Sequence, residues 1–116
     1  IKNALEKLQA NTTYFVSNPS EHKGNWKALF KNDNPIHIEI GCGKGGFVIE
    51  LAKRQPDVNF IALEKMSNVI LTPLEEVKKR GIENIRFLNI RAECLPCYIP
   101  ARCWRCYLYA LDTRCR

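Results

Sequence analysis

The residues best suited to chemistry are the glycines of residues 40–46, IGCGKGG, which follow an apolar run. Gly41, Gly43 and Gly45 fit the pattern G-x-G-x-G, and Gly46 in place of Gly45 also fits the dinucleotide pattern G-x-G-x-x-G, which alone is a weak signal. A glycine-rich turn that opens a helix presents free backbone N–H groups to a ligand. No Lys-Ser/Thr pair follows the last glycine, so P-loop chemistry is excluded.

Two acidic residues restrict the choice of ligand. Glu39 stands two positions before the first glycine, and Glu64 follows the next apolar run at the distance where a carboxylate reaches a ribose diol. A pyrophosphate beside Glu39 would meet like-charge repulsion. S-adenosyl-L-methionine instead carries a sulfonium and an ammonium and has no phosphate. The sequence therefore predicts S-adenosyl-L-methionine as the cofactor. A NAD-dependent dehydrogenase is a weaker alternative, and so is a glycine turn that only packs a strand against a helix.

The elements that would position these groups alternate between apolar strands and amphipathic helices. We expect strands near 36–41, 58–63 and 84–89, joined by helices at 46–55 and 67–81. Crossovers of this length predict one parallel sheet with right-handed connections. The fold class is therefore α/β, corresponding to half of a nucleotide-binding fold.

The helix expected at 67–81 contains a proline. Ser67 is predicted to cap this helix and Gly81 to end it. Pro73 removes an amide donor from the interior, so it should kink the helix or move its start to that point.

The first third of the chain predicts short helical pieces. Residues 1–17 suggest a short amphipathic helix with Leu5 and Leu8 on one side, followed by a loose Asn-Thr-Thr stretch. Ser20 is suited to cap a later turn. That turn carries Trp26, which we interpret as a packing anchor. The expected organisation is a helical extension at 1–34 and a half domain that begins at residue 35.

Three stretches resemble the family of bacterial tRNA (guanine-N7-)-methyltransferases. They are NPSEHKGNW at 18–26, the run from NDNPIHIEIG to FIALEK at 32–65, and IENIRFLNIRAECLP at 82–96. The resemblance covers about Asn18 to Pro100, so the half domain spans 35–100. It implies a Rossmann-like class I S-adenosylmethionine-dependent methyltransferase fold, with an incomplete parallel sheet and flanking helices. It also implies a cytoplasmic enzyme that acts on tRNA.

The resemblance also implies which residues bind the cofactor, with Glu64 on the ribose and the glycine loop along the methionine portion. These residues are Glu39, Gly41, Cys42, Gly43, Lys44, Gly45, Glu64, Lys65, Asn89, Arg91 and Ala92. Arg91 departs from the family, which has an aspartate there at the adenine end of the site. Because N7 of guanine has a lone pair and no proton, its methylation needs no base. The catalytic residues stay unknown, and we predict no metal.

Single residues near these motifs have plain structural interpretations. Cys42 is expected to be a small loop residue rather than a nucleophile. His22 and His37 are expected to be structural. Lys44 is suited either to approach substrate phosphates or to be solvated.

The tail, residues 101–116, is rich in cysteine and arginine and falls outside the resemblance. The preferred interpretation is translation in a shifted reading frame. One alternative is a zinc site on Cys94-x2-Cys97 and Cys103-x2-Cys106. Another is a degenerate fourth strand formed by Tyr107, Leu108, Tyr109 and Asp112.

The family continues into an Asp-Pro-Trp-Pro segment and a second half of the sheet, which this chain lacks. We therefore expect a truncated version that is weakly active or inactive. The alternatives are a non-catalytic nucleotide- or RNA-binding remnant and a methyltransferase of the same fold with another substrate. The oligomeric state stays unknown.

Composition agrees with a small domain that meets a polyanion. The chain has 116 residues, a formal net charge of +6 and six cysteines. The positive charge favours a partner such as tRNA. No signal peptide or membrane-spanning run is visible, so we expect no membrane association and no framework of disulfides.

Overall fold

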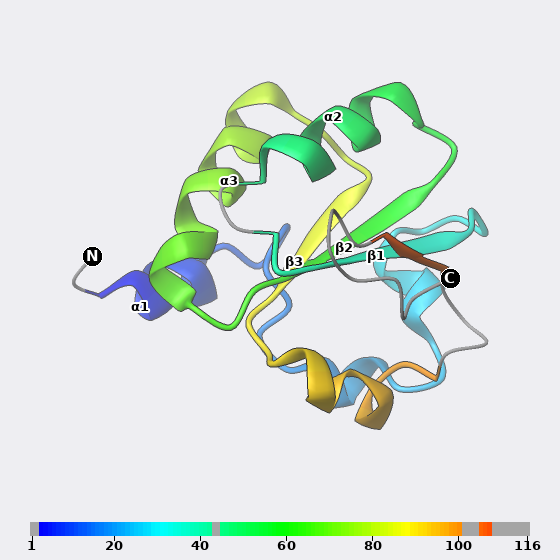
Figure 1. The fold of residues 1–116 in the computed structure, drawn as a ribbon, viewed down its shortest axis with the longest axis horizontal. Coiled ribbons are helices and arrows are strands. Elements are labelled where there is room, and N and C mark those ends of the chain that lie inside the picture. The colour runs from blue at the N-terminus through cyan, green and yellow to red at the C-terminus, as the bar shows by residue number, and fades with distance from the viewer. Residues whose placement is uncertain (1–2, 43–44, 101–104, 108–116) are drawn as a thin grey trace.

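The computed structural model describes residues 3–42, 45–100 and 105–107. Within these residues, four strands form one parallel sheet in the order β3-β2-β1-β4 (Figure 1). The strands are β1 Ile36–Ile40, β2 Asn59–Leu63, β3 Ile85–Leu88 and β4 Arg105–Tyr107. The three strands expected from the sequence therefore exist, lie within a residue or two of their predicted bounds, and are parallel as predicted.

Helices cover both faces of the sheet. Figure 1 shows α2 (Gly46–Arg54) and α3 (Ser67–Arg80) on one side, with η3 (Ala92–Cys97) on the other. The helix α1 (Ala4–Ala10) packs against α3, and two further 3-10 turns are η1 (Pro19–His22) and η2 (Trp26–Leu29). None of the helices in the described part of the chain is long and apolar enough to cross a bilayer.

Each face of the sheet has its own apolar core, because side chains alternate between the two faces along each strand. The core under the α-helices includes Phe60, Phe87 and Ile70. The core under the 3-10 turns includes Ile38 and Trp26, and the indole Nε1–H of Trp26 donates a hydrogen bond to the carbonyl oxygen of Tyr98 at 3.0 Å. Trp26 is thus the packing anchor that the sequence predicted.

The N-terminal segment covers the outer edge of β3. The Val16 N–H donates to the Phe87 carbonyl oxygen at 3.0 Å, and the Phe87 N–H donates to the Tyr14 carbonyl oxygen at 2.8 Å. This pairing satisfies backbone groups that an edge strand would otherwise expose. The helix α1 ends at Ala10, before the Asn-Thr-Thr stretch as the sequence predicted, and Phe15 then forms an isolated parallel bridge with Phe87.

The same helix differs from expectation in its buried face. Leu8 is fully buried, whereas Leu5 is 44% exposed, so the two leucines do not share one buried side. The second buried residue of α1 is Ala4, one turn before Leu8. A small residue at that position lets α1 pack closely on α3.

The helix α3 runs without interruption through its proline. It begins at Ser67 with Met66 as the N-cap residue, so the predicted Ser67 cap is wrong. A start displaced to Pro73 is also wrong, because Pro73 lies inside the helix and is buried. Gly81 ends the helix at φ 66°, as predicted, since glycine adopts this left-handed conformation at little cost.

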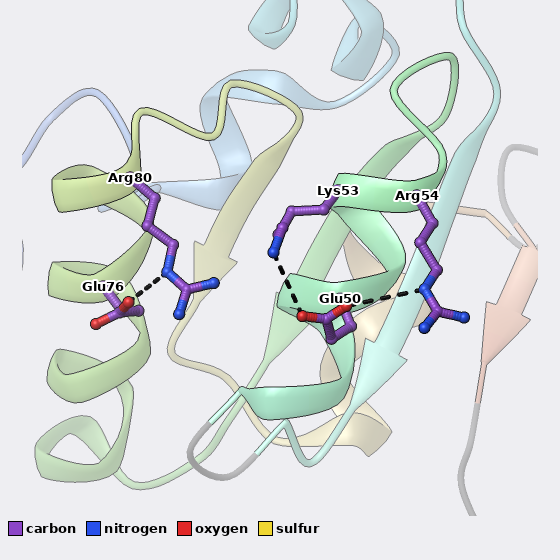
Figure 2. A network of polar contacts seen from close by, with 5 residues as sticks. All are labelled: Glu50, Lys53, Arg54, Glu76 and Arg80. Atoms are coloured by element: carbon purple, nitrogen blue, oxygen red, sulfur yellow. Dashed lines mark hydrogen bonds and ion pairs between the residues drawn. The ribbon is translucent and has the colours of Figure 1, made fainter.

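Basic residues end both α2 and α3 and pair with glutamates of the preceding turn. Glu50 pairs with Lys53 at 3.5 Å and with Arg54 at 3.8 Å, while Arg80 pairs with Glu76 (Figure 2). These pairs are solvent-exposed, so each contributes at most about 1 kcal/mol to stability. Because α2 begins at the glycine loop, at the carboxyl end of β1, its basic end lies toward the amino ends of the strands.

The strand β4 lies beyond Pro100, in the tail expected to fall outside the resemblance. It pairs in parallel with β1, with His37 opposite Arg105 and Glu39 opposite Tyr107. A fourth strand is thus present, although Leu108, Tyr109 and Asp112 lie outside the described residues. Cys103 also lies outside them, so the zinc site stays an untested alternative, and the shifted reading frame stays a prediction.

Candidate functional site

The candidate site is the edge of the sheet where β1, β2 and β3 end. Their last residues are in register, with Ile40 opposite Leu63 and Leu63 opposite Leu88. The N–H groups of Gly41 and Cys42 both donate to the Leu63 carbonyl oxygen at 2.9 Å. These bonds extend the strand pairing past the strand ends, so the start of the glycine loop is fixed beside the end of β2.

The glycines of this loop have different reasons to be glycine. Gly41 has φ 71° and is exposed, and a Cβ added there would meet no atom within 4 Å. Gly45 has φ 76° and packs against Pro73, whose Cβ would overlap a Cβ added at Gly45. Gly41 thus leaves open backbone beside the strand ends, while Gly45 serves helix packing. Gly43 and Lys44 lie outside the described residues.

Glu39 is a buried carboxylate within this edge. Its side chain is 1% exposed and lies on the same face of β1 as His37, whose ring contacts Phe60 edge-on at 5.7 Å between centroids. That face is covered by α2 and α3, so Glu39 lies beneath the helices rather than at the surface. His37 packs on an aromatic ring of the core, in agreement with the structural role expected for it.

The pKa of the Cys42 thiol reflects burial and the negative charge around the glycine loop. Burial, together with the nearby carboxylates of Glu39 and Glu64, raises the pKa of its thiol to about 12. The thiol is therefore protonated at neutral pH and is a poor nucleophile. Its 8% exposure agrees with a small packed loop residue. Both carboxylates thus act on the same loop.

Glu64 and Asn89 form the second part of the site. One carboxylate oxygen of Glu64, Oε2, accepts a hydrogen bond from the Met66 N–H at 3.1 Å. The Asn89 Nδ2 donates to the carbonyl oxygens of Glu64 at 3.0 Å and Lys65 at 3.1 Å. Asn89 therefore fixes the backbone that carries Glu64, a role that the sequence did not reveal. Lys65 itself is exposed.

Arg91 and Ala92 follow β3 and lead into η3, and both are exposed. The Arg91 Nε lies 3.4 Å from the Glu93 Oε1. A hydrogen bond to backbone lowers the pKa of Glu93, and the Arg91 charge lowers it further. The positive charge at position 91 is thus partly offset by its neighbour.

Two exposed apolar side chains also flank the site. Phe47 in the first turn of α2 is 46% exposed, and Met66 after Glu64 is 48% exposed. Sequence periodicity places Phe47 with the apolar residues of its helix, but Val48, Ile49 and Ala52 form the buried side instead. One sign in the sequence indicates that these two side chains flank the site: Phe47 lies next to the glycine loop, and Met66 lies close to Glu64.

The parallel sheet, the glycine loop and the helices on both faces define a partial Rossmann-like fold of the methyltransferase class. Two solved structures agree with this fold. One is an antibiotic-related methyltransferase, with a TM-score of 0.60 and 17% identity over 87% of this chain and 52% of that chain. The other is SMU.1697c of Streptococcus mutans, solved in complex with SAH, with a TM-score of 0.55 and 14% identity over 85% and 57% of the two chains.

Sequence comparison gives the family. The model of a family described as "Putative methyltransferase" matches residues 33–108, and the chain belongs to this family. A tRNA (guanine-N(7)-)-methyltransferase of Bacillus cytotoxicus is 44% identical over 79% of this chain and 42% of the relative. The enzyme of the same name from Bacillus velezensis is 48% identical over 76% of this chain and 41% of the relative. The one from Bacillus subtilis is 43% identical over 90% of this chain and 50% of the relative. The chain spans half or less of the length of these relatives.

Proposed function

We propose that the carboxyl edge of the sheet binds S-adenosyl-L-methionine. The observation that carries the proposal is the pair of acids, Glu39 and Glu64, placed at the ends of adjacent parallel strands on either side of open glycine backbone. The proposed binding residues are the ones expected from the sequence: Glu39, Gly41, Cys42, Gly43, Lys44, Gly45, Glu64, Lys65, Asn89, Arg91 and Ala92.

The charge of the site supports this ligand. Both carboxylates raise the pKa of the Cys42 thiol, so the loop lies in a negative field. A negative field favours a ligand with a sulfonium and an ammonium and disfavours a pyrophosphate. The exposed backbone of Gly41 leaves room for the ligand to approach the loop. A dinucleotide is less well suited to this site, because its phosphates would lie close to the two carboxylates.

Four residues have different proposed roles in cofactor binding. Glu64 follows the end of β2, where a carboxylate is suited to bind a ribose hydroxyl. Asn89 holds the Glu64 segment against the end of β3. Glu39 contributes charge from beneath the loop. Arg91, whose charge is offset by Glu93, flanks the proposed adenine end.

The activity that we propose is methylation of guanine N7 in tRNA. It is supported by the names of the Bacillus relatives and by the positive net charge, +6, of a chain that would meet a polyanion. When bound, the cofactor supplies an electrophilic methyl group. Guanine N7 offers a lone pair and loses no proton, so the protein needs to align donor and acceptor rather than supply a base.

Cofactor binding and methyl transfer to tRNA can be tested by separate measurements. Calorimetric titration of the chain with S-adenosyl-L-methionine and with NAD should show saturable binding of the first and weaker or no binding of the second. Tighter binding of NAD would overturn the cofactor assignment. Incubation with unmodified tRNA and S-adenosyl-L-methionine, followed by nuclease digestion and mass spectrometry, should reveal N7-methylguanosine. Cofactor binding without this product would favour a non-catalytic binding module.

A further inference from the structure

The pair Cys94 and Cys97 lies outside the proposed chemistry and has a geometry of its own. Both residues belong to η3, which runs from Ala92 to Cys97, and both carry free thiols. In a 3-10 helix, side chains three positions apart stand one above the other. The rise per residue separates their Cα atoms by about 6 Å along the axis, which lies within the range of about 4.4–6.8 Å that a disulfide spans.

The backbone of this turn is held in place by its neighbours. Leu95, between the two cysteines, is 2% exposed, and Ile99, two residues after Cys97, is fully buried, so the turn is anchored in the core at both points. The Cys94 N–H donates to the Arg91 carbonyl oxygen at 3.0 Å, and the Tyr98 N–H donates to the Leu95 carbonyl oxygen at 2.9 Å. The two cysteines are thus kept one turn apart without help from their sulfur atoms.

The two thiols differ in access to solvent. Cys97 is exposed, whereas Cys94 is partly buried. A C-x-x-C pair beside a β-α-β unit is also a pattern typical of redox-active dithiols. We propose that Cys94 and Cys97 form a modification site that low-molecular-weight disulfides such as oxidised glutathione convert to an internal disulfide. This inference stands apart from the proposed methyltransferase function.

The reaction consists of two thiol–disulfide exchanges. The Cys97 thiolate attacks one sulfur of oxidised glutathione, the S–S bond breaks, and one glutathione thiolate leaves. The Cys94 thiolate then attacks the Cys97 sulfur of this mixed disulfide and expels the second glutathione thiolate. The protein dithiol loses two electrons and two protons, and oxidised glutathione becomes two molecules of reduced glutathione.

The chain allows a direct test on the whole protein, because trypsin cleavage after Arg91 and Arg102 places Cys94 and Cys97 together on one peptide with no other cysteine. The folded chain is incubated with oxidised glutathione, its free thiols are alkylated, and it is digested and analysed by mass spectrometry. We expect the 92–102 peptide to lose both alkylation sites and two hydrogens, and dithiothreitol to restore both sites. Cys42 should stay reduced, because its thiol is buried and protonated.

Variants separate the internal disulfide from other outcomes. In Cys94→Ser the exchange should stop at a glutathione adduct on Cys97, whereas Cys97→Ser should react more slowly because Cys94 is partly buried. A triple Ser variant of Cys103, Cys106 and Cys115 should leave the internal disulfide unchanged. Separate glutathione adducts on Cys94 and Cys97 of the unmodified chain would overturn the proposal. Links from Cys94 or Cys97 to tail cysteines in place of each other would also overturn it.

Discussion

Gly45 of the glycine loop packs directly on Pro73 of α3, so closely that a Cβ at Gly45 would overlap the Cβ of Pro73. This contact joins the two features of the sequence that seemed least related, a glycine at the end of a ligand-binding loop and a proline inside a helix. Gly45 precedes α2, and its carbonyl oxygen accepts the Ile49 N–H at 3.0 Å. The contact therefore fixes where α2 begins relative to α3.

Substitution of Gly45 should test this packing. Gly45→Ala places a Cβ at φ 76° and against Pro73, and we expect the free energy of unfolding to fall by at least about 2 kcal/mol in urea titrations. Gly24 is the matched control, because it also has φ 76° but a Cβ there meets no atom within 4 Å. Gly24→Ala should lose only the conformational part, about 1–2 kcal/mol. Equal losses in the two variants would contradict the role of Pro73.

Removal of the Glu64 carboxylate should weaken cofactor binding. Glu64→Ala is expected to lose about 1.5–3 kcal/mol of S-adenosyl-L-methionine binding in calorimetry, the range for a hydrogen bond to a charged group. Glu64→Gln keeps an oxygen that can accept the Met66 N–H, so it should lose less. Glu50→Ala, which alters an exposed face of α2, is the control and should leave affinity unchanged. Full affinity in Glu64→Ala would count against this placement of the cofactor.

Two asparagines offer a test of positioning. Asn89 and Asn84 both donate from Nδ2 to backbone carbonyl oxygens, but Asn89 holds residues 64 and 65 whereas Asn84 holds Ala52, Gln55 and Val58 at the opposite edge of the sheet. Alanine at either position should lower the free energy of unfolding by about 1–3 kcal/mol, because carbonyl groups lose their donors.

The cofactor affinities of these two variants should differ. We expect Asn89→Ala to bind S-adenosyl-L-methionine more weakly than the unmodified chain, since the carbonyl groups of residues 64 and 65 lose the donor that positions them. Asn84→Ala should bind it as the unmodified chain does, at a temperature where both variants are folded. A parallel loss of affinity in both would show that the effect comes from stability alone.

Cys42 should make stability depend on alkaline pH. Its folded-state pKa of about 12 exceeds the usual 9.0, so above pH 9 the unfolded chain releases a proton that the folded chain keeps. The free energy of unfolding should therefore fall as pH rises from about 9 toward 12, by up to about 1.4 kcal/mol per pH unit from this group. Below pH 9 the group contributes no slope.

The matching measurement compares the unmodified chain with Cys42→Ala in a reducing buffer. Between pH 8.5 and pH 10.5 the unmodified chain should lose on the order of 2 kcal/mol more than the variant. Lysine and tyrosine titrations occur in both chains and cancel in the difference. Identical pH profiles would mean that the thiol ionises as freely in the folded chain as in the unfolded one.

Local sequence was enough to predict the elements and the main features of the site. Apolar alternation and turn residues determine where strands and helices form, and parallel strands bring their ends to one edge. Glu39, Gly41 and Glu64 could therefore be placed together from the chain order alone. The family resemblance added the expected cofactor role of Asn89, Arg91 and Ala92.

Tertiary structure decided the contacts between residues that are far apart in the sequence. The Asn89 amide meets carbonyl groups 24 and 25 positions away, and Tyr14 and Val16 pair with Phe87 on the edge of β3. The burial of Glu39 and the contact of Gly45 with Pro73 also depend on how α2 and α3 pack on the sheet. No local pattern encodes such partners, because they are set by the packing of whole elements that the chain brings together only when it folds.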